Sequence, residues 1–351
     1  MTIFALTLEP GRKGTAELAK VPEPDPSEGA VLCRTIAVGV DGTDAEIVDG
    51  LYGEAPPGRD RLILGHESLG RVLEAPAASG VAEGDLVVAF VRRPDPQPCE
   101  ACATGEWDMC RNGRYTEHGI KGVDGFLAER FRIEADRLVR PDASLGRLAV
   151  LTEPTSVVAK AWEHAERVGR RTEWTPARAL VTGAGPLGLL GAMLGVQRGL
   201  EVHVLDVVET GPKPDRAREL GATYHAGSLD EIAGAFDVIV ECTGVGPVVL
   251  HAMEHLAPDG VMVMTGISGA MRMAEIDADV LNKRVVLNNN ALVGSVNANA
   301  RHYRQAADAL ARADRGWLER LVTRWVPLES WRDALDRRPD DVKVVVEVSP
   351  S

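Results

Sequence analysis

A glycine-rich turn between two expected β-strands constrains the fold of this chain more than any other feature. The apolar run 179–182 leads directly into Gly183-Ala184-Gly185-Pro186-Leu187-Gly188, which opens an apolar helix, and a second strand begins at about residue 201. In a βαβ unit the first glycine allows the tight turn, the second lets a pyrophosphate approach the backbone, and the third lets the helix pack on the strand. The helix N-terminus then holds the phosphates. Although such a turn can be purely structural, this context predicts a dinucleotide site that includes Gly183, Gly185, Pro186, Leu187 and Gly188.

Asp206 provides the second part of this expected site. It ends the second strand, 18 residues beyond Gly188, where a carboxylate can accept hydrogen bonds from the ribose hydroxyls of adenosine. A carboxylate there repels a 2′-phosphate, and the two residues that follow, Val207 and Val208, include no arginine to bind one. The sequence therefore favours NAD over NADP, with a solvated aspartate at a strand end as the alternative. Thr243 is also assigned to cofactor binding.

The 351-residue chain divides into regions with different sequence patterns. From residue 1 to about 140, short β-rich runs alternate with glycine and proline turns, which is typical of a partly open β-barrel. From about residue 154, strands alternate with helices, which predicts a doubly wound parallel sheet. We therefore expect an α/β protein with three segments, 1–154, 155–293 and 294–351, the last of which returns to the first domain.

Composition excludes several classes of protein. Lysine and arginine number 39 against 52 aspartate and glutamate, a net charge of −13, so we expect no nucleic-acid partner. Hydrophobic residues make up 45% and charged residues 26%, which is typical of a globular chain. The longest apolar stretch, 187–196, is too short for a membrane span, and residues 1–10 lack a secretory pattern. These features lead us to expect a cytoplasmic protein.

Three short motifs carry candidate chemistry, although each is common when it stands alone. They are Gly39-Val40-Asp41-Gly42-Thr43-Asp44, Gly65-His66-Glu67 and Glu153-Pro154. A lone aspartate in a glycine-rich turn is usually a turn former. In this order, however, the motifs resemble the zinc-containing medium-chain dehydrogenase/reductase family, which joins a GroES-like β-barrel catalytic domain to a Rossmann cofactor domain. Four segments resemble the glucose 1-dehydrogenase branch of this family, namely 92–94, 119–126, 152–160 and 294–297.

The resemblance implies a catalytic zinc site formed by four residues with oxygen or nitrogen donors, Asp41, His66, Glu67 and Glu153. The first two would bind the ion, and the two glutamates, which the sequence does not rank, would supply a third ligand or hold the metal-bound water. Asp41 stands where most members have cysteine, and this hard oxygen donor discriminates less well among divalent ions. The resemblance also implies that Thr43 passes a proton from the substrate hydroxyl and that Asp44 orients the ligating histidine. Their alternatives are a turn hydroxyl and a helix cap.

A cluster of cysteines predicts a second zinc site. Cys99, Cys102 and Cys110 match the last three positions of the structural zinc lobe of the same family, whereas Pro96 occupies the first position. Either a carboxylate such as Asp95 completes the tetrahedron or the lobe is metal-free. In a chain expected in the cytoplasm, clustered thiols favour metal over disulfide.

The resemblance also implies a sugar substrate. Glu117 resembles a glutamate that hydrogen-bonds sugar hydroxyls, with a solvated loop acid as the alternative, and Asn297 resembles an asparagine near the sugar and the nicotinamide. Glu153 is included among the substrate contacts. Val91, in contrast, replaces a sugar-binding asparagine of one type of relative.

Together these features predict zinc-dependent oxidation of a glucose-like aldose at its anomeric hydroxyl to an aldonolactone, with hydride transfer to NAD. The cleft between the two domains would bring the sugar and the cofactor together. The alternatives are a related sugar, polyol or cyclitol dehydrogenase and a non-catalytic dinucleotide-binding protein. Relatives are commonly dimers or tetramers, so we expect a homodimer or a homotetramer.

Overall fold

The computed structural model describes residues 1–269 and 276–349. The chain forms two compact units, Met1–Ser156 with Asn297–Ser351, and Val157–Val296. The segment boundaries expected from the sequence, after 154 and after 293, lie within a few residues of these limits. Among the described helices, none is long and apolar enough to cross a membrane.

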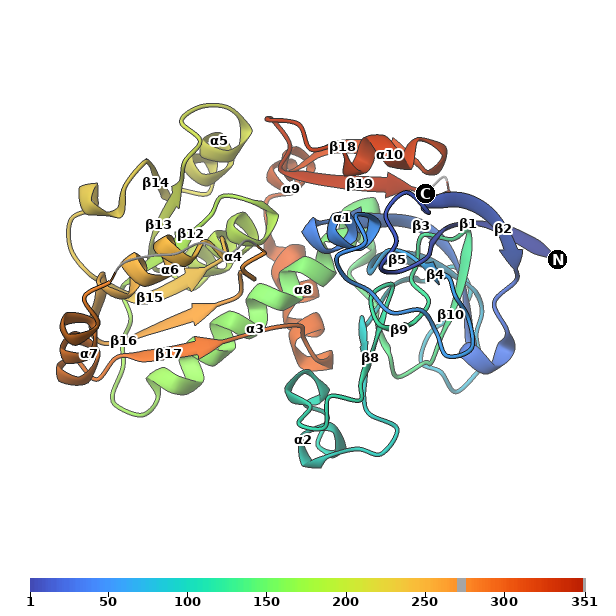
Figure 1. The fold of residues 1–351 in the computed structure, drawn as a ribbon, viewed down its shortest axis with the longest axis horizontal. Helices are drawn as coiled ribbons and strands as arrows, with labels where there is room; N and C mark the ends of the chain where they lie inside the picture. The colour runs from blue at the N-terminus through green and yellow to red at the C-terminus, as the bar shows by residue number, and fades with distance from the viewer. Residues whose placement is uncertain (270–275, 350–351) are drawn as a thin grey trace. The chain divides into compact units, whose positions relative to one another are not determined.

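The first unit is built from three sheets whose strands come from both ends of the chain (Figure 1). One sheet has the order β2-β1-β4, a second β7-β8-β9, and the largest β11-β6-β5-β3-β19-β18, with β10 also paired to β3. The strands are β1 (Thr2–Leu8), β2 (Glu17–Pro22), β3 (Val31–Val40), β4 (Leu62–Ile63), β5 (Glu67–Glu74), β6 (Leu86–Ala89), β7 (Arg92–Arg93), β8 (Thr116–His118), β9 (Gly122–Val123), β10 (Arg130–Ile133), β11 (Leu138–Val139), β18 (Val322–Pro327) and β19 (Lys343–Glu347).

Strand β3 is the centre of this unit. It is buried along almost its whole length and pairs with β5, β10 and β19, so both of its edges are covered. Branched and aromatic side chains such as Val38, Val72, Phe131 and Val344 fill the core around it, as expected for strands with apolar faces turned inward. The helical elements are η1 (Pro26–Glu28), α1 (Gly42–Val48), α2 (Glu100–Ala103), η2 (Trp107–Met109), η3 (Ala143–Leu151), α8 (Ala300–Arg312), α9 (Arg315–Leu321), η5 (Leu328–Ser330) and α10 (Trp331–Leu335).

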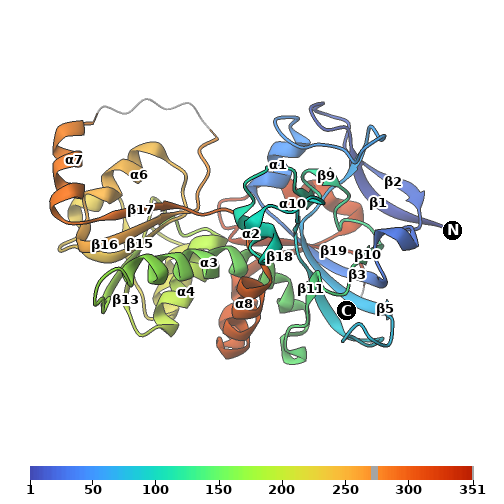
Figure 2. The same cartoon turned by 90° about the horizontal axis from the view of Figure 1, so that it is seen from below.

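The second unit contains a six-stranded parallel sheet of order β14-β13-β12-β15-β16-β17. Figure 2 shows α6 on one face of this sheet and α4 on the other. Its strands are β12 (Arg178–Thr182), β13 (Glu201–Asp206), β14 (Thr223–Ala226), β15 (Phe236–Glu241), β16 (Leu256–Met264) and β17 (Ala291–Gly294). The helical elements are α4 (Pro186–Gln197), α5 (Pro212–Glu219), η4 (Leu229–Glu231), α6 (Gly246–Met253) and α7 (Ala278–Leu287), and α3 (Thr152–Gly169) enters this unit from the first.

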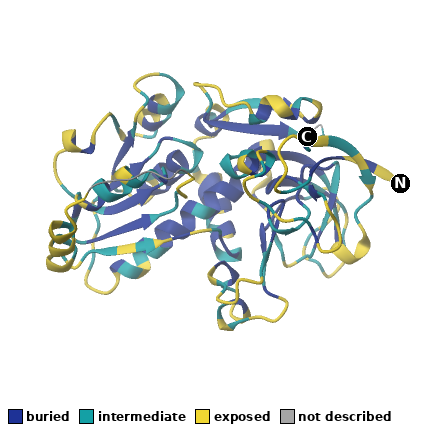
Figure 3. Ribbon diagram, viewed as in Figure 1, coloured by how far each residue is buried: buried dark blue, intermediate teal, exposed yellow. Residues whose placement is uncertain are grey.

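The predicted fold class, a GroES-like β-barrel domain combined with a Rossmann domain, is confirmed by this architecture and by the comparisons given below. Strand order reverses between β12 and β15, which is the switch point where ligands bind in doubly wound sheets. The middle strands β12 and β15 are buried on both faces, whereas α7 has no buried residue (Figure 3). The glycine turn that ends β12 therefore lies at the switch point.

Candidate metal centre and cofactor site

Asp41 lies between β3 and α1, where it caps the helix. Its Oδ1 accepts hydrogen bonds from the backbone N–H groups of Thr43 at 2.7 Å and Asp44 at 3.4 Å. In return, Oδ2 of Asp44 accepts a hydrogen bond from the Asp41 backbone N–H at 3.1 Å, which completes a capping box. The Thr43 hydroxyl lies 3.4 Å from the second oxygen of Asp41. The cap thus holds Asp41 through Oδ1, and the other oxygen of Asp41, Oδ2, faces His66.

His66 lies between two carboxylates. Its Nε2 is 3.7 Å from Asp41 Oδ2 and its Nδ1 is 3.4 Å from Asp44 Oδ1. Burial alone lowers the pKa of His66, but the two carboxylates outweigh it and raise the pKa well above its usual value. Asp44, which is fully buried, is therefore part of the helix cap and also contacts the imidazole. These are the two roles considered for Asp44 from the sequence.

Glu67 forms a buried ion pair with Lys343 that the sequence analysis missed. The two residues start β5 and β19, which both pair with β3, and each is 1% exposed. They meet over Gly39 of β3, where an added Cβ would lie 1.8 Å from Glu67 Oε2. Lys343 also donates a hydrogen bond to the backbone oxygen of Val40 at 3.0 Å. A lysine inside the apolar run 342–346 was the available signal, because a lysine is seldom fully buried unless it is paired.

Glu153 lies in the first turn of α3 and is also buried. Burial raises the pKa of Glu153 to about 8, with the charges of Glu67 and Asp41 adding to the effect and those of His66 and Lys343 opposing it. Burial also raises the pKa of Glu67, against the lowering effect of Lys343. Glu153 therefore shares the electrostatic environment of the other acidic residues of this centre.

The donor atoms of this centre fit a divalent metal ion. One ligand atom from each of Asp41, His66 and Glu67 lies within 4.8 Å of the other two, and Glu153 lies outside this triplet. Burial raises the pKa values of Glu67 and Glu153, and a divalent cation beside these carboxylates would stabilise their charged form. Two oxygens and one nitrogen suit zinc, and they also accept other divalent ions.

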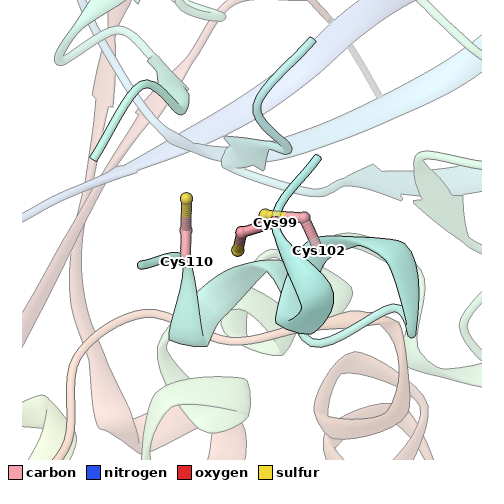
Figure 4. Close-up of side chains that lie close together, drawn as sticks. All are labelled: Cys99, Cys102 and Cys110. Atoms are coloured by element: carbon pink, nitrogen blue, oxygen red, sulfur yellow. The ribbon is translucent and has the colours of Figure 1, made fainter. Parts of the chain in front are cut away.

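The cysteine lobe is the second cluster of possible metal ligands in this unit (Figure 4). Cys99, Cys102 and Cys110 have sulfur atoms within 4.8 Å of one another, around the short elements α2 and η2. Backbone N–H groups, first that of Arg111, lower the pKa of Cys99 to about 6, a value that favours a thiolate at neutral pH.

Asp95, the carboxylate considered as a fourth ligand, is held by other partners. It accepts hydrogen bonds from Asn112 Nδ2 at 2.7 Å, Gln97 N at 2.8 Å and Arg114 Nε at 3.2 Å. It does not belong to the triplet of cysteine sulfurs. Two of these donors share Oδ2 and one binds Oδ1, so a metal ion bound through Asp95 would share the carboxylate with them.

The glycine turn of the second unit has the geometry that its sequence predicts. Gly183 has a φ of 89°, which an L side chain rarely adopts. A Cβ on Gly188 would lie 1.7 Å from the backbone oxygen of Gly183, so only glycine allows α4 to pack this closely. A Cβ on Gly185 would meet nothing within 4 Å, and Pro186 occupies the first turn of α4. Open space thus lies at the helix N-terminus, where a pyrophosphate binds in such units.

Asp206 ends β13 and holds the glycine turn in place. Its carboxylate accepts hydrogen bonds from Ala184 N at 2.7 Å and Val208 N at 3.1 Å. Lys213, at the start of α5, places its Nζ 3.6 Å from Asp206 Oδ2. The sequence analysis considered only the residues directly after Asp206 and missed this cation, which reduces the negative potential at the expected ribose position.

Thr243 lies in the loop after β15 and is held by Glu241, another residue that the sequence analysis missed. Oε1 of Glu241 accepts hydrogen bonds from Thr243 N at 2.7 Å, from the Thr243 hydroxyl and from Gly244 N at 3.1 Å. Glu241 has no exposed surface, and an acid at the end of an otherwise apolar strand was the signal for such a role. The buried carboxylate of Glu241 therefore holds the loop that carries Thr243 in place.

Glu117 belongs to a buried polar network and is not a solvated loop acid. Its Oε1 accepts hydrogen bonds from Arg92 Nη2 at 3.0 Å, Arg92 Nε at 3.1 Å and Asn297 Nδ2 at 2.8 Å. Asn297 has a φ of 61°, in the left-handed region that asparagine adopts more readily than most residues other than glycine. Among the described residues, the hydrogen bonds of the Glu117 side chain all end on Oε1.

Comparisons with known proteins agree with this architecture. Residues 27–143 match the family described as the alcohol dehydrogenase GroES-like domain, and residues 146–348 match the glucose dehydrogenase C-terminus. The glucose 1-dehydrogenase of Methanocella arvoryzae is 38% identical over 98% of this chain and 99% of its own. The glucose 1-dehydrogenase 1 of Caldivirga maquilingensis is 42% identical over 99% of both chains.

The similarity extends to solved structures. A crystal structure of glucose dehydrogenase from Haloferax mediterranei covers 99% of this chain and 100% of its own, with 35% identity and a TM-score of 0.91. The same enzyme in complex with NADP, Zn and gluconolactone gives the same coverage, identity and TM-score. The resemblance stated from the motifs is thereby confirmed. This chain belongs to the zinc-containing medium-chain dehydrogenase/reductase family and, within it, to the glucose 1-dehydrogenases.

Proposed function

We propose that this chain is an NAD(P)-dependent dehydrogenase that oxidises a glucose-like aldopyranose at the anomeric C1 hydroxyl and yields an aldonolactone. The observation that carries the proposal is the largely buried triplet Asp41, His66 and Glu67, whose donor atoms lie within 4.8 Å of one another. This triplet occurs in a chain that also contains a glycine turn suited to a dinucleotide. Full-length similarity to glucose 1-dehydrogenases supports the same reaction class.

Asp41 and His66 would hold the catalytic zinc, with Glu67 or Glu153 as a third ligand or as the residue that holds a water molecule. Bound zinc supplies Lewis acidity, which makes a substrate hydroxyl easier to deprotonate. Asp44, 3.4 Å from Nδ1, keeps the imidazole in a fixed orientation. Glu67 is the better placed of the two glutamates, because it belongs to the triplet. Its ion pair with Lys343, however, competes with a metal ion for the same carboxylate.

The proton of the substrate hydroxyl would leave through residues at the start of α1 and β5. The Thr43 hydroxyl, 3.4 Å from Asp41 Oδ2, can accept this proton and pass it to water or to Glu67. Lys343 favours the charged form of Glu67, the form that can accept a proton. Removal of this proton accompanies departure of a hydride from C1 to the nicotinamide, which keeps charge and electrons balanced.

Glu117 and Asn297 would bind the sugar hydroxyls. Arg92 and Asn297 occupy Oε1 of Glu117, so its second oxygen is the acceptor for a substrate hydroxyl. Such buried acceptors reject analogues that lack the matching hydroxyl. Val91 is buried and apolar and offers no side-chain hydrogen bond, which favours a related sugar, polyol or cyclitol as the second candidate substrate class.

The cofactor would bind at Gly183, Gly185, Pro186, Leu187 and Gly188, with Thr243 in the neighbouring loop and NAD preferred over NADP. Asp206 supports NAD, since a carboxylate repels a 2′-phosphate. Lys213, 3.6 Å from that carboxylate, opposes this preference. One relative of known structure, the glucose dehydrogenase of Haloferax mediterranei, was solved with NADP. We therefore expect activity with both cofactors and a preference for NAD that Asp206→Ala reverses and Lys213→Ala strengthens.

A spectrophotometric screen of aldoses and polyols, with NAD and NADP in parallel, tests the proposal. We expect an aldose to be oxidised, gluconolactone or a related lactone to be trapped as product, and chelation to abolish the rate. Full activity after complete metal removal would contradict the proposed centre, and activity only on cyclitols would contradict the substrate. The predicted homodimer or homotetramer is tested separately by light scattering of the purified chain.

A further inference from the structure

The second unit has a cluster of potential metal ligands that the proposed function does not use. Asp230, His251 and His255 each offer one ligand atom, and these atoms lie within 4.8 Å of one another. His251 lies in the last turn of α6 and His255 two residues past its end, and their rings are in contact. Asp230 comes from η4, which precedes β15. Two separate elements therefore contribute donors to one place.

We propose that Asp230, His251 and His255 form a surface site for a divalent transition-metal ion, such as zinc or nickel, on the second unit. Two imidazoles and a carboxylate are a donor set that zinc uses with three protein ligands, and water would complete the coordination. Imidazole ligands select zinc, nickel and copper over magnesium and calcium. The bound ion would join η4 to the end of α6.

The geometry is prepared for such an ion. Nε2 of His251 lies 2.9 Å from Asp230 Oδ1. The centroids of the His251 and His255 rings are 5.3 Å apart, and the angle between the ring planes is 64°. Ser228 Oγ donates a hydrogen bond to the other carboxylate oxygen, Oδ2, at 3.0 Å, which turns Oδ1 toward the histidine. The side chain of Asp230 is 74% exposed and that of His251 is 32% exposed, so an ion can enter from solvent.

Zinc and nickel titrations of the untagged full-length chain, first loaded with zinc at its other sites, test the proposal. Calorimetry should detect one additional ion per chain at pH 7.5, and the thermal unfolding midpoint should rise with the concentration of added metal. In the double variant His251→Gln/His255→Gln we expect affinity at least about tenfold lower and no metal-dependent rise in the midpoint. Glu254→Gln, beside the site but not a ligand, is the matched control and should retain the additional ion.

Circular dichroism and dehydrogenase activity without added metal should be the same in the double variant as in the parent chain, which shows that the variant folds. Equal metal binding by the parent chain and the double variant would overturn the proposal. The proposal would also be overturned if the parent chain bound no additional ion up to millimolar metal. The contact between His251 and Asp230 would then be a hydrogen bond without a metal-binding role. The loss of dehydrogenase activity on His66→Ala, by contrast, tests the catalytic centre alone, so the two proposals fail independently.

Discussion

Among the described residues of the first unit, two clusters of possible metal ligands differ in nearly every physical respect. The Asp41, His66 and Glu67 triplet has oxygen and nitrogen donors, is largely buried, and depends on Lys343 from the far end of the chain. The cysteine cluster has sulfur donors that all come from one short segment, 99–110. The first therefore concentrates buried charge suited to chemistry, whereas the second lies within one short segment of the chain. Substitutions in or beside the two clusters should therefore have different effects on activity and stability.

The largest effect is expected from His66→Ala. Removal of the imidazole takes one donor from the triplet, so we expect kcat/KM to fall by at least about a thousandfold, which corresponds to about 4 kcal/mol. Steady-state kinetics and metal analysis of the purified variant measure this. Asp44→Asn, which leaves every donor in place, should cost only about 10- to 100-fold. A His66→Ala enzyme with more than a tenth of the parent activity would show that the triplet is not catalytic.

The next largest effect is on stability and concerns the buried pair Glu67–Lys343. Lys343→Met removes one partner and leaves an uncompensated buried carboxylate, which should lower the free energy of unfolding by about 3 kcal/mol in metal-free protein. Glu67→Gln in the same chain should restore much of this loss, so a double-mutant cycle by urea unfolding gives the coupling. Arg114→Met, at the exposed partner of Asp95 beside the cysteine cluster, should cost less than about 1 kcal/mol.

The contrast between local and distant contacts also explains what the sequence could predict. The glycine turn 183–188 was predictable because its meaning depends only on the strand before it and the helix after it. The Asp41 cap was predictable for the same reason, since the whole capping box lies within four consecutive residues. The convergence of Asp41 with His66 and Glu67 was expected only through the family resemblance, because no local pattern joins these positions.

Several of the missed contacts depend on how strands pair and how helices pack. Lys343 meets Glu67 only because β19 and β5 both pair with β3. Lys213 approaches Asp206 because α5 turns back toward the end of β13, and Arg92 pairs with Glu117 because β7 pairs with β8. In each case a charge finds its partner through sheet pairing or helix packing, which residue spacing does not encode.

A smaller effect is expected from a second buried histidine of this unit, whose pKa shifts in the direction opposite to that of His66. Burial, with the nearby charge of Arg93, lowers the pKa of His118 to about 3, and its Nδ1 lies 2.7 Å from the backbone oxygen of Asp124. The unfolded chain therefore takes up a proton below its pKa of about 6.5 while the folded chain does not, so stability falls as pH decreases from about 6.5 toward 3. At pH 5 this loss amounts to about 2 kcal/mol.

His118→Asn, whose amide can still donate to Asp124, isolates that contribution. Urea unfolding at pH 7.5 and at pH 5 should show a smaller acid-induced loss in the variant than in the parent chain, by about 2 kcal/mol. His225→Asn is a suitable comparison, because His225 is more exposed and its lowered pKa arises first from weaker burial. Equal acid sensitivity of the parent and His118→Asn would show that His118 is not held neutral in the folded state.

The smallest effect on catalysis is expected at the cysteine cluster, where metal content and thiol reactivity are the informative measurements. Because its ligands lie in one local segment, Cys102→Ser should change kcat by less than about twofold while zinc content falls by one ion per chain and the thermal midpoint decreases.

If the cluster holds zinc, Cys99 is protected from iodoacetamide at pH 7. If it is metal-free, the low pKa of Cys99, about 6, makes it the fastest thiol of the chain to react. Asp95→Asn then tests whether the carboxylate is a ligand, since its one amide oxygen can keep the hydrogen bond from Gln97 or the one from Asn112 but binds zinc poorly. Loss of zinc in this variant would mean that Asp95 completes the tetrahedron, and unchanged zinc would leave three cysteines with water.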